Sequence, residues 1–325
     1  MASSSSVSVP ALRMNDGRSM PAIALGTFLG VGPVKKANET EVRDAVELAI
    51  DLGYRHIDTA YIYQTEKQIG EALKNKIEEG VVKREDMFIT TKLWNNHHKR
   101  EDVALELKES LEHLKLNYVD LYLMHWPFGL NSDNTLSDVD FMETWRGMED
   151  VQKLGLTKSI GISNFNKEQL ERLLREGTVK PAALQIEVHP QIIQTEILEL
   201  CRSHGIVVMG YSPLGSLVSR FGTMFPGPKM DDPILVTLAN KYGKTPAQIV
   251  LRWSIDRNVV PLPKSVNPKR LEENINIFDF KLTDEEIESI NGYNANVRMI
   301  VPSFWQESKY YPFDKVETPL PNPFL

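Results

Sequence analysis

Cysteine is almost absent from this chain: its 325 residues contain a single one, Cys201. No internal disulfide is therefore available to support the fold, and a reducing compartment is the simplest expectation. Long apolar runs are absent too, because no stretch approaches the roughly 18 residues that a membrane-spanning helix requires. The opening MASSSSVSVP also lacks a basic region followed by an apolar one. We expect a cytoplasmic protein without a membrane partner, in which residues 1–6 form a loose tail.

An excess of positive charge is missing as well. Lysine and arginine total 37 against 44 aspartate and glutamate residues, which gives a formal net charge of −7. This balance excludes a general attraction to nucleic acids and confines any anion-binding site to a local cluster. The hydrophobic fraction of 42% and the charged fraction of 25% are typical of folded globular proteins, so disorder is excluded.

Several binding and catalytic motifs are also absent. The sequence has no G-x-G-x-x-G, because Gly26, Gly30 and Gly32 have the wrong spacing for a dinucleotide-binding turn. It has no H-E-x-x-H, and the adjacent His97 and His98 lack metal-ligand spacing, so we expect no metal. The motif GYSPLG at 210–215 misses G-x-S-x-G by one residue, which argues against a serine hydrolase.

Strand and helix patterns alternate along the chain. Short apolar or β-branched runs predict eight strands, at residues 22–27, 55–60, 88–93, 119–126, 159–164, 183–189, 206–212 and 259–264. The helices have recognisable starts, in which a capping residue precedes a glutamine or glutamate by three positions: Asn166 and Gln169, Thr245 and Gln248, Thr283 and Glu286. Eight strand–helix repeats favour an α/β fold of the (β/α)₈ TIM-barrel type over the competing doubly wound open sheet.

The remaining segments complete a single barrel domain over residues 1–325. The run Asn15-Asp16-Gly17 predicts a β-hairpin within residues 7–20, placed to close the N-terminal end of the barrel. Long connections at 127–140 and 213–232 follow the fourth and seventh strands, so we expect them to rise over the catalytic end. Residues 292–325 form a long C-terminal loop rich in aromatic side chains.

Four side chains that can exchange protons lie where consecutive strands end, and these ends meet around one mouth in a barrel. They are Asp58, Tyr63, Lys92 and His125. A free tyrosine has a pKa of about 10, and a neighbouring cation such as Lys92 would stabilise its phenolate and improve it as a proton donor. Asp58 would orient Lys92, and His125 would hydrogen-bond a carbonyl oxygen. Each side chain also has a structural interpretation, as ion pair, rim aromatic or core histidine, but their shared position favours function.

A second cluster lies at the end of the eighth strand. Lys264 and Ser265 precede the Asn267-Pro268 helix start, and Arg270 falls in the first turn, so cations and free N–H groups would converge on a phosphate. A solvated basic face is the alternative. The position is the usual phosphate site of such barrels, and the chain is otherwise acidic, which favours binding.

Polar side chains also end the fifth to seventh strands. Ser163, Asn164, Gln185 and Tyr211 have the groups to hold an amide-bearing cofactor and to stack on it. Helix capping and ordinary packing explain the same residues equally well.

Five motifs resemble those of the aldo-keto reductases: GYRHIDTA at 53–60 with Tyr63 downstream, TKLW at 91–94, LMHWP at 123–127, GISNF at 161–165 and PKS at 263–265. The resemblance covers nearly the whole chain in the family's order. It implies a (β/α)₈ barrel, usually a monomer, that binds NADPH without a Rossmann domain and reduces aldehydes or ketones. Asp58, Tyr63, Lys92 and His125 match the family's catalytic tetrad, in which the tyrosine gives the proton and the nicotinamide gives the hydride.

The resemblance also implies the NADPH/NADP⁺ contacts. Ser163, Asn164 and Gln185 match the carboxamide contacts, and Tyr211 matches the ring that stacks on the nicotinamide. The 2′-phosphate site, which implies a preference for NADPH over NADH, matches Lys264, Ser265, Asn267 and Arg270. The other implied contacts are Ser212, Leu214 and Ser216 near the pyrophosphate, Glu273 and Asn274 near the adenine, and Gly26, Thr27, Asp58 and Val266.

The substrate pocket is where the chain departs from its relatives. Phe28 stands where aldose reductases have tryptophan, and the 213–232 loop, with Phe221, Met224 and Phe225, has its own composition. The implied pocket residues are Phe28, Ile62, Tyr63, Trp94, His125, Trp126, Phe128, Phe304 and Trp305. Apolar walls of this kind suit a lipophilic carbonyl, such as a steroid-like or prostanoid ketone, better than a free sugar. His125 replaces the glutamate of family members that reduce a steroid C=C bond, which favours C=O chemistry. The C-terminal SFW and YYPF are most similar to insect members, including the 3-dehydroecdysteroid reductases.

Two other functions stay open. A cofactor-bound regulatory or binding protein, as in the potassium-channel β subunits, would keep the site with little turnover. A barrel hydrolase or aldolase would use Lys92 as a Schiff-base nucleophile, although Asp58 would keep that amine protonated.

Overall fold

A computed structural model describes residues 7–30, 40–218, 225 and 227–323. The predicted tail at 1–6 lies outside these residues, as do Phe221 and Met224.

Eight parallel strands follow one another in chain order around a single sheet: β3 (Leu25–Gly26), β4 (His56–Asp58), β5 (Phe88–Leu93), β6 (Val119–Met124), β7 (Thr157–Ser163), β8 (Ala183–Glu187), β9 (Val207–Tyr211) and β10 (Val259–Pro261). The sheet closes because Ala24 N donates to Pro261 O at 3.2 Å and Gly26 N donates to Pro263 O at 3.1 Å. Glycine suits this seam, since a Cβ at position 26 would lie 3.0 Å from Leu262 O. The predicted barrel is confirmed.

The strands agree with the predicted runs except at three places: 22–27, 55–60 and 259–264 are reduced to the shorter strands β3, β4 and β10. The run at 22–27 is reduced to β3, because only Leu25 and Gly26 pair with β4. The longer apolar runs pair over most of their length; β5 keeps the predicted bounds. Burial on both faces explains why these strands lack polar alternation.

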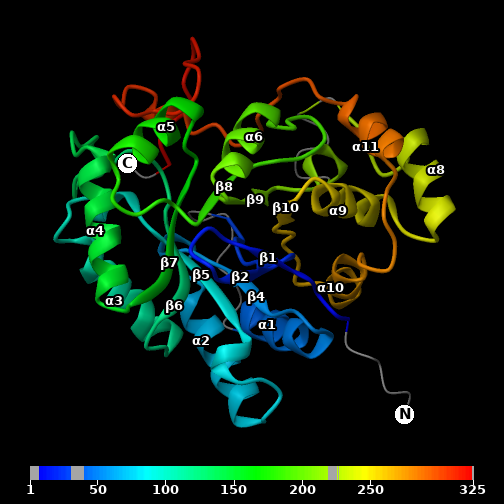
Figure 1. Cartoon of the computed structure of the whole chain (residues 1–325), viewed down its shortest axis with the longest axis horizontal. Coiled ribbons are helices and arrows are strands. Elements are labelled where there is room, and N and C mark those ends of the chain that lie inside the picture. Colours follow the sequence, from blue (N-terminus) through cyan, green and yellow to red (C-terminus); the bar gives the residue numbers. More distant parts are fainter. Residues whose placement is uncertain (1–6, 31–39, 219–224, 226, 324–325) are drawn as a thin grey trace.

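Helices surround the barrel (Figure 1), and their bounds are α1 (Glu41–Leu52), α2 (Glu66–Glu78), α3 (Val103–Leu114), α4 (Phe141–Lys153), α5 (Lys167–Glu176), α6 (Thr195–Ser203), α8 (Pro233–Tyr242), α9 (Pro246–Asp256), α10 (Pro268–Ile275) and α11 (Asp284–Asn291). Short 3₁₀ turns are η2 (Tyr61–Tyr63), η3 (Arg84–Asp86), η4 (Asn95–His97), η5 (Gly215–Leu217) and η6 (Ser303–Trp305). The three predicted capping boxes, at the starts of α5, α9 and α11, are all present. None of the described helices is long and apolar enough to cross a bilayer.

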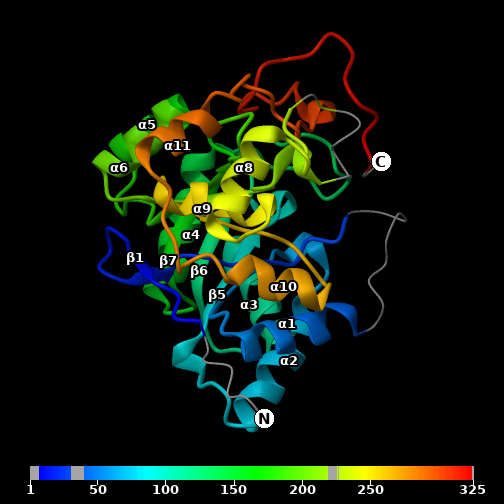
Figure 2. The same ribbon diagram turned by 90° about the vertical axis from the view of Figure 1, so that its right-hand side faces the viewer.

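An antiparallel hairpin of β1 (Ala11–Arg13) and β2 (Ser19–Pro21) lies on one side of the barrel, and the C-terminal segment lies on the other (Figure 2). Its turn contains Gly17 at a φ of 86°, a conformation that glycine adopts without strain. Met14 and Met20 pack with barrel-interior side chains such as Leu121. The hairpin therefore closes the end at which the strands begin, as predicted.

The C-terminal segment, residues 292–323, crosses the opposite end and is tied to the barrel by a buried carboxylate. Glu187, at the end of β8, is fully buried and accepts hydrogen bonds from the backbone N–H groups of Met299 at 2.7 Å and Ile300 at 3.1 Å. Charge-assisted bonds of this kind are stronger than neutral ones. They hold the segment that carries Phe304 and Trp305 over the mouth of the barrel.

Candidate active site

The four predicted acid–base side chains meet at the mouth of the barrel. Asp58 is the last residue of β4, Lys92 lies one residue before the end of β5, Tyr63 ends η2, and His125 directly follows β6. Parallel strands bring their carboxyl ends to one edge, so residues far apart in sequence become neighbours.

Lys92 is at the centre of this cluster and has no exposed surface. Its Nζ donates to Asp58 Oδ1 at 2.7 Å, to Thr59 O at 2.8 Å and to Tyr63 Oη at 3.4 Å. The other carboxylate oxygen of Asp58 accepts from Gln185 Nε2 at 2.7 Å. All three N–H groups of the ammonium are thus engaged, which argues against a Schiff-base role for Lys92.

Burial and ion pairing have opposite effects on the pKa values of Asp58 and Lys92. Burial raises the pKa of Asp58 and lowers the pKa of Lys92, and the attraction between the two groups opposes both shifts. A buried ion pair is stable only when its remaining lone pairs and protons are also hydrogen-bonded. Gln185 and Thr59 supply those bonds, so the pair is held in one geometry.

The expectation that the neighbouring Lys92 makes Tyr63 an acidic phenol is wrong in its net result. Burial raises the pKa of Tyr63 well above 10, and the negative charge of Asp58 adds to the shift. Desolvation of a phenolate therefore outweighs the ammonium at 3.4 Å. The phenol keeps its proton at neutral pH, which is the state that a proton donor needs.

His125 lies beside the phenol as a neutral imidazole. Its ring is centred 5.8 Å from the Tyr63 ring and 5.2 Å from the Trp94 ring. Burial lowers the pKa of His125 well below 6.5, and the positive charge of Lys92 lowers it further. No side-chain hydrogen bond to a described residue occupies this ring, and Nδ1 is buried without a partner.

Aromatic side chains predicted to line the pocket form one cluster over this site. Trp305 lies 5.9 Å from Trp94, 5.4 Å from Phe128 and 4.7 Å from Phe304, measured between ring centroids. Trp126 joins through Phe128 at 5.8 Å. Phe28 packs separately, on the Tyr63 ring at 4.9 Å, and Ile62 is partly buried against the core.

The amide-bearing side chains beyond the tetrad are linked by hydrogen bonds. Asn164 Nδ2 donates to His125 O at 3.0 Å and to Ser163 Oγ at 3.2 Å, and Asn164 Oδ1 accepts from the Tyr211 hydroxyl at 2.8 Å. Asn164 has a φ of 61°, which asparagine tolerates better than most residues. Ser163, Asn164 and Gln185 are each at most 3% exposed. The structure therefore places four predicted cofactor contacts beside the tetrad.

The cluster at the end of β10 has the predicted form of a helix start. Asn267 caps α10 by accepting from Arg270 N at 3.1 Å, and Ser265 Oγ accepts from Asn267 N at 3.1 Å. The side chains of Lys264 and Arg270 are exposed. Val266 is partly buried, Glu273 lies 3.7 Å from Lys269, and Asn274 is buried.

The other predicted cofactor contacts follow the carboxyl ends of β3 and β9. Thr27 Oγ1 donates to Asp58 O at 2.9 Å, which fixes the end of β3 against β4. Ser212 has a φ of 49°, and Leu214 packs on the core. Ser216 donates its hydroxyl to Pro228 O at 2.8 Å, so it anchors the 213–232 loop.

Comparison with known proteins agrees with this geometry. A sequence model of the Aldo/keto reductase family matches residues 22–295. Aldo-keto reductase AKR2E4 of Bombyx mori is 48% identical over 307 residues, which are 94% of this chain and 99% of that protein. The chain belongs to the aldo-keto reductase family. As such it is an oxidoreductase that acts on carbonyl and alcohol groups.

Solved aldo-keto reductases share the fold closely. The crystal structure of Bombyx mori AKR2E4 in complex with NADP has a TM-score of 0.91 and 47% identity, covering 94% of this chain and all 100% of that one. That of AKR2E5 complexed with NADPH has a TM-score of 0.95 and 43% identity, covering 98% of each chain. The family uses NADP(H), and the cofactor predicted from the sequence is confirmed at that level.

The mouth of this aldo-keto reductase fits a nicotinamide nucleotide on two counts. The Ser163 hydroxyl has a hydrogen to donate and Gln185 Oε1 can accept, which matches the acceptor and donor of a carboxamide. The exposed side chains of Lys264 and Arg270 flank the start of α10, where the helix dipole also favours an anion, and this combination matches a phosphate ester.

Sequence reasoning missed a carboxylate that holds the pocket wall. Glu106 in α3 is fully buried; it accepts from Trp94 N at 2.6 Å and lies 2.8 Å from His97 Nδ1. Burial raises its pKa, and the His97 contact opposes that shift. The signal was available, because Glu106 lies on the apolar stripe of α3 between Val103 and Leu107.

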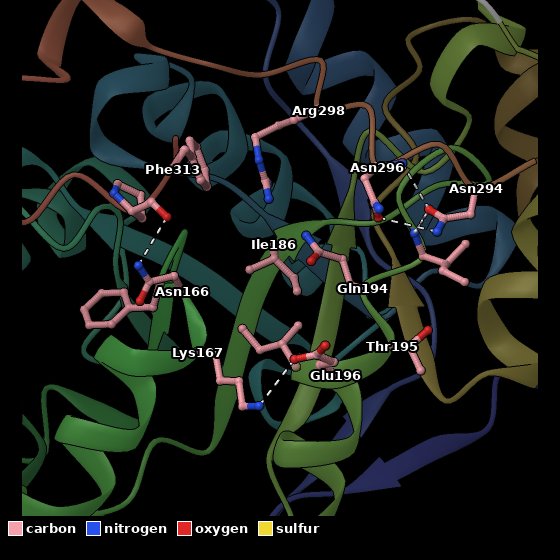
Figure 3. Close-up of a pocket in the computed structure, with 14 residues that line it drawn as sticks. Asn166, Lys167, Ile186, Gln194, Thr195, Glu196, Asn294, Asn296, Arg298 and Phe313 are labelled. Carbon is pink, nitrogen blue, oxygen red and sulfur yellow. Dashed lines mark hydrogen bonds and ion pairs between the residues drawn. The ribbon is translucent and has the colours of Figure 1, made fainter. Parts of the chain in front are cut away.

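Arg298 is a further neighbour of these aromatic side chains that the sequence did not single out, and it packs on Phe313 of the YYPF motif. The Arg298 guanidinium lies 3.9 Å from the centroid of the Phe313 ring and shifts the pKa of Tyr211 downward against the dominant effect of burial. Both side chains line a cavity of about 370 Å³ between the C-terminal segment and the starts of α5 and α6 (Figure 3). None of the four tetrad residues lines this cavity, so it is separate from the catalytic mouth.

Proposed function

We propose that this chain reduces lipophilic aldehydes and ketones to alcohols with NADPH, and that Tyr63 is the proton donor. The observation that carries the proposal is the position of Lys92 Nζ, which lies 2.7 Å from Asp58 and 3.4 Å from Tyr63 in a mouth roofed by aromatic rings. This is an arrangement for transferring a proton to an oxygen away from bulk water.

Tyr63 and Lys92 act on the carbonyl oxygen together. The neutral phenol gives its proton to the oxygen as negative charge develops there, and the ammonium stabilises the phenolate that remains. Asp58 keeps Lys92 protonated and pointing at Tyr63. His125 is neutral, so it can donate a hydrogen bond to the same oxygen and fix its direction without adding a charge.

NADPH, when bound, supplies the hydride that adds to the carbonyl carbon. Ser163, Asn164 and Gln185 hold the carboxamide, and Tyr211 offers its ring for stacking. Lys264, Ser265 and Arg270 at the start of α10 take the 2′-phosphate, which favours NADPH over NADH.

The aromatic side chains that cover the mouth of the barrel indicate the substrate class. Trp94, Trp126, Phe128 and Trp305 are each less than 8% exposed, so most of their surface faces other apolar groups. A free sugar would have to leave its hydroxyl groups unsatisfied against such walls. A bulky ketone or an aromatic aldehyde, with one polar atom directed at Tyr63, fits better.

Consumption of NADPH with a panel of carbonyl compounds tests the function. We expect kcat/KM to be at least about 100-fold higher for steroid ketones, prostanoid ketones or aromatic aldehydes than for glucose, since burial of a few methylene groups is worth that much. Equal or better turnover of glucose would contradict the substrate class. Tight NADPH binding with no oxidation by any member of the panel would favour a regulatory protein instead.

The proposal also covers the oligomeric state and the cellular compartment of the enzyme. We propose a single-domain monomer in the cytoplasm, where the buried thiol of Cys201 stays reduced. Burial raises the pKa of Cys201 to about 12, so it is a poor nucleophile. Light scattering of the purified chain should give one monomer mass; a stable dimer would contradict this part.

A further inference from the structure

A second charged region lies at the end of the barrel where the strands begin. A cavity of about 360 Å³ is lined there by Arg13 at the end of β1, Arg202 in α6 and Arg257 between α9 and β10. The apolar wall consists of Leu12, Leu198, Ile206, Val207 and Val208, and Gly205 and Asn258 complete the lining. We call this feature the arginine cleft.

The cleft concentrates positive charge in an acidic chain. Its lining contains three arginines and no aspartate or glutamate, although the whole chain has a net charge of −7. Within the described part of the chain, none of the three guanidinium groups has a carboxylate within 4.0 Å. By contrast, Arg84, Arg100, Arg172 and Arg252 all have such partners.

Arg257 is the most enclosed of the three. Its Nη2 donates to Ile193 O at 2.7 Å and its guanidinium lies 4.5 Å from the centroid of the Trp253 ring. Its Nη1 is buried with no hydrogen-bond partner among the described residues. A buried N–H group without an acceptor is costly, so an anion that reached this atom would relieve that cost.

The charges also repel each other. Burial, together with the positive charge of Arg202, lowers the pKa of Arg257 to about 10, and the negative charge of Glu288 opposes the shift. An anion in the cleft would neutralise both guanidinium groups and supply the missing acceptor.

We propose that the arginine cleft binds a phosphate monoester whose organic body is apolar. A dianionic phosphate offers the guanidinium groups more acceptor oxygens and more negative charge than a carboxylate does. The cavity is larger than a phosphate group, and Leu12, Leu198 and Ile206 provide a wall for the body of the ligand. The site lies at the opposite end of the barrel from Tyr63 and does not depend on the proposed reaction.

Phenyl phosphate is a suitable probe, measured by calorimetric titration of the protein saturated with NADP⁺. Saturation fills the proposed phosphate site at Lys264 and Arg270, so that only other sites respond. We expect one site that binds phenyl phosphate, binds inorganic phosphate about tenfold more weakly, and does not bind phenol. Affinity should fall with added salt, because both partners are charged.

Arg202→Met is the variant that tests the assignment, and Arg175→Met is its matched control. Both arginines are exposed and lack an ion pair with a described residue, but Arg175 lies in α5, outside the cleft. We expect affinity for phenyl phosphate to fall at least tenfold in Arg202→Met and to stay within twofold in Arg175→Met. Arg257→Lys, which keeps the charge but loses the buried Nη1, should weaken binding by a similar factor.

Three results would overturn the proposal. They are no binding of phenyl phosphate to the NADP⁺-saturated protein, equal affinity in Arg202→Met and wild type, and binding of benzoate as tight as that of phenyl phosphate. The last result would leave a carboxylate site in place of a phosphate site.

Discussion

The two ends of the barrel treat buried charge in opposite ways. At the mouth, the Lys92 ammonium has no exposed surface, yet a carboxylate, a carbonyl oxygen and a phenol oxygen accept from it. At the other end, Arg257 keeps a buried Nη1 without a partner and faces Arg202. The same barrel therefore holds one cation whose N–H groups are all satisfied from within the chain and one for which this is not so.

This difference in pairing indicates how each end of the barrel should respond when a charged side chain is removed. A charge paired internally fixes the geometry of its partners, so its removal should damage both activity and stability. An exposed charge such as that of Arg202, which has no ion pair with a described residue, contributes little to the fold, so its removal should mainly affect binding of an outside anion.

Removal of the Lys92 charge should have the largest effect. In Lys92→Met the buried Asp58 carboxylate loses its cation, so we expect the free energy of unfolding to fall by about 3–5 kcal/mol. We also expect kcat to fall about 1000-fold, because Tyr63 loses the charge that stabilises its phenolate. Denaturant unfolding and steady-state kinetics measure the two effects.

The double variant Lys92→Met with Asp58→Asn separates the loss of stability from the loss of activity. It removes both charges of the pair, so stability should recover by at least half while activity stays low. Recovery of activity in the double variant would show that Lys92 serves the fold and not the reaction.

Acid should destabilise the protein through two buried histidines. Burial lowers the pKa of His56 and of His98 to about 3, so both stay neutral in the folded chain. The unfolded chain takes up these protons below about pH 6.5, so the stability they give is present above that pH and is lost as the pH falls towards 3. Each should cost about 2 kcal/mol at pH 5. Unfolding free energies measured from pH 7 to 5 should show this slope, and a flat profile would contradict it.

The exposed cations at the start of α10 should set cofactor preference. Arg270→Met should raise the KM for NADPH about 10- to 100-fold, the value of a charged hydrogen bond, and change the KM for NADH less than twofold. The cap of α10 should survive, because it uses the Arg270 backbone N–H. Lys269→Met is the control, since this neighbour is exposed and pairs loosely with Glu273 at 3.7 Å. Equal effects of the two substitutions on NADPH would contradict the assignment.

The smallest effect on stability should come from a substitution in the arginine cleft when no ligand is bound. Arg202→Met should leave the free energy of unfolding unchanged or raise it by about 0.5 kcal/mol or less, since it removes repulsion of Arg257 and breaks no ion pair with a described residue. Thermal unfolding in a phosphate-free buffer measures it. A loss above about 1 kcal/mol would show that Arg202 has an internal role after all.

Local patterns were enough to predict the barrel and the positions that face its mouth. Apolar runs marked the strands, and capping residues such as Asn166 and Thr245 marked helix starts, because both signals depend on neighbours in sequence. Asp58, Lys92 and His125 could be placed together because parallel strands bring their ends to one edge.

Contacts between distant segments were not predictable in the same way. The arginine cleft joins positions 13, 202 and 257, which no sequence period connects. The link from Glu187 to Met299 and Ile300 depends on where the C-terminal segment crosses the mouth. The pKa of Tyr63 was misjudged because the sequence shows the nearby cation but not the depth of burial, and burial is the larger effect.

The most direct test of the account is the rate of hydride transfer in a single turnover of Tyr63→Phe. Stopped-flow decay of NADPH fluorescence with an aromatic aldehyde gives the rate, and titration of the same protein gives the Kd for NADPH. Tyr61→Phe is the control, since the Tyr61 hydroxyl contacts only Glu109 among the described residues. We predict a loss of about 1000-fold in Tyr63→Phe, with a Kd within threefold of wild type and a normal rate in the control. A Tyr63→Phe rate within tenfold of wild type would contradict the assignment of the proton donor.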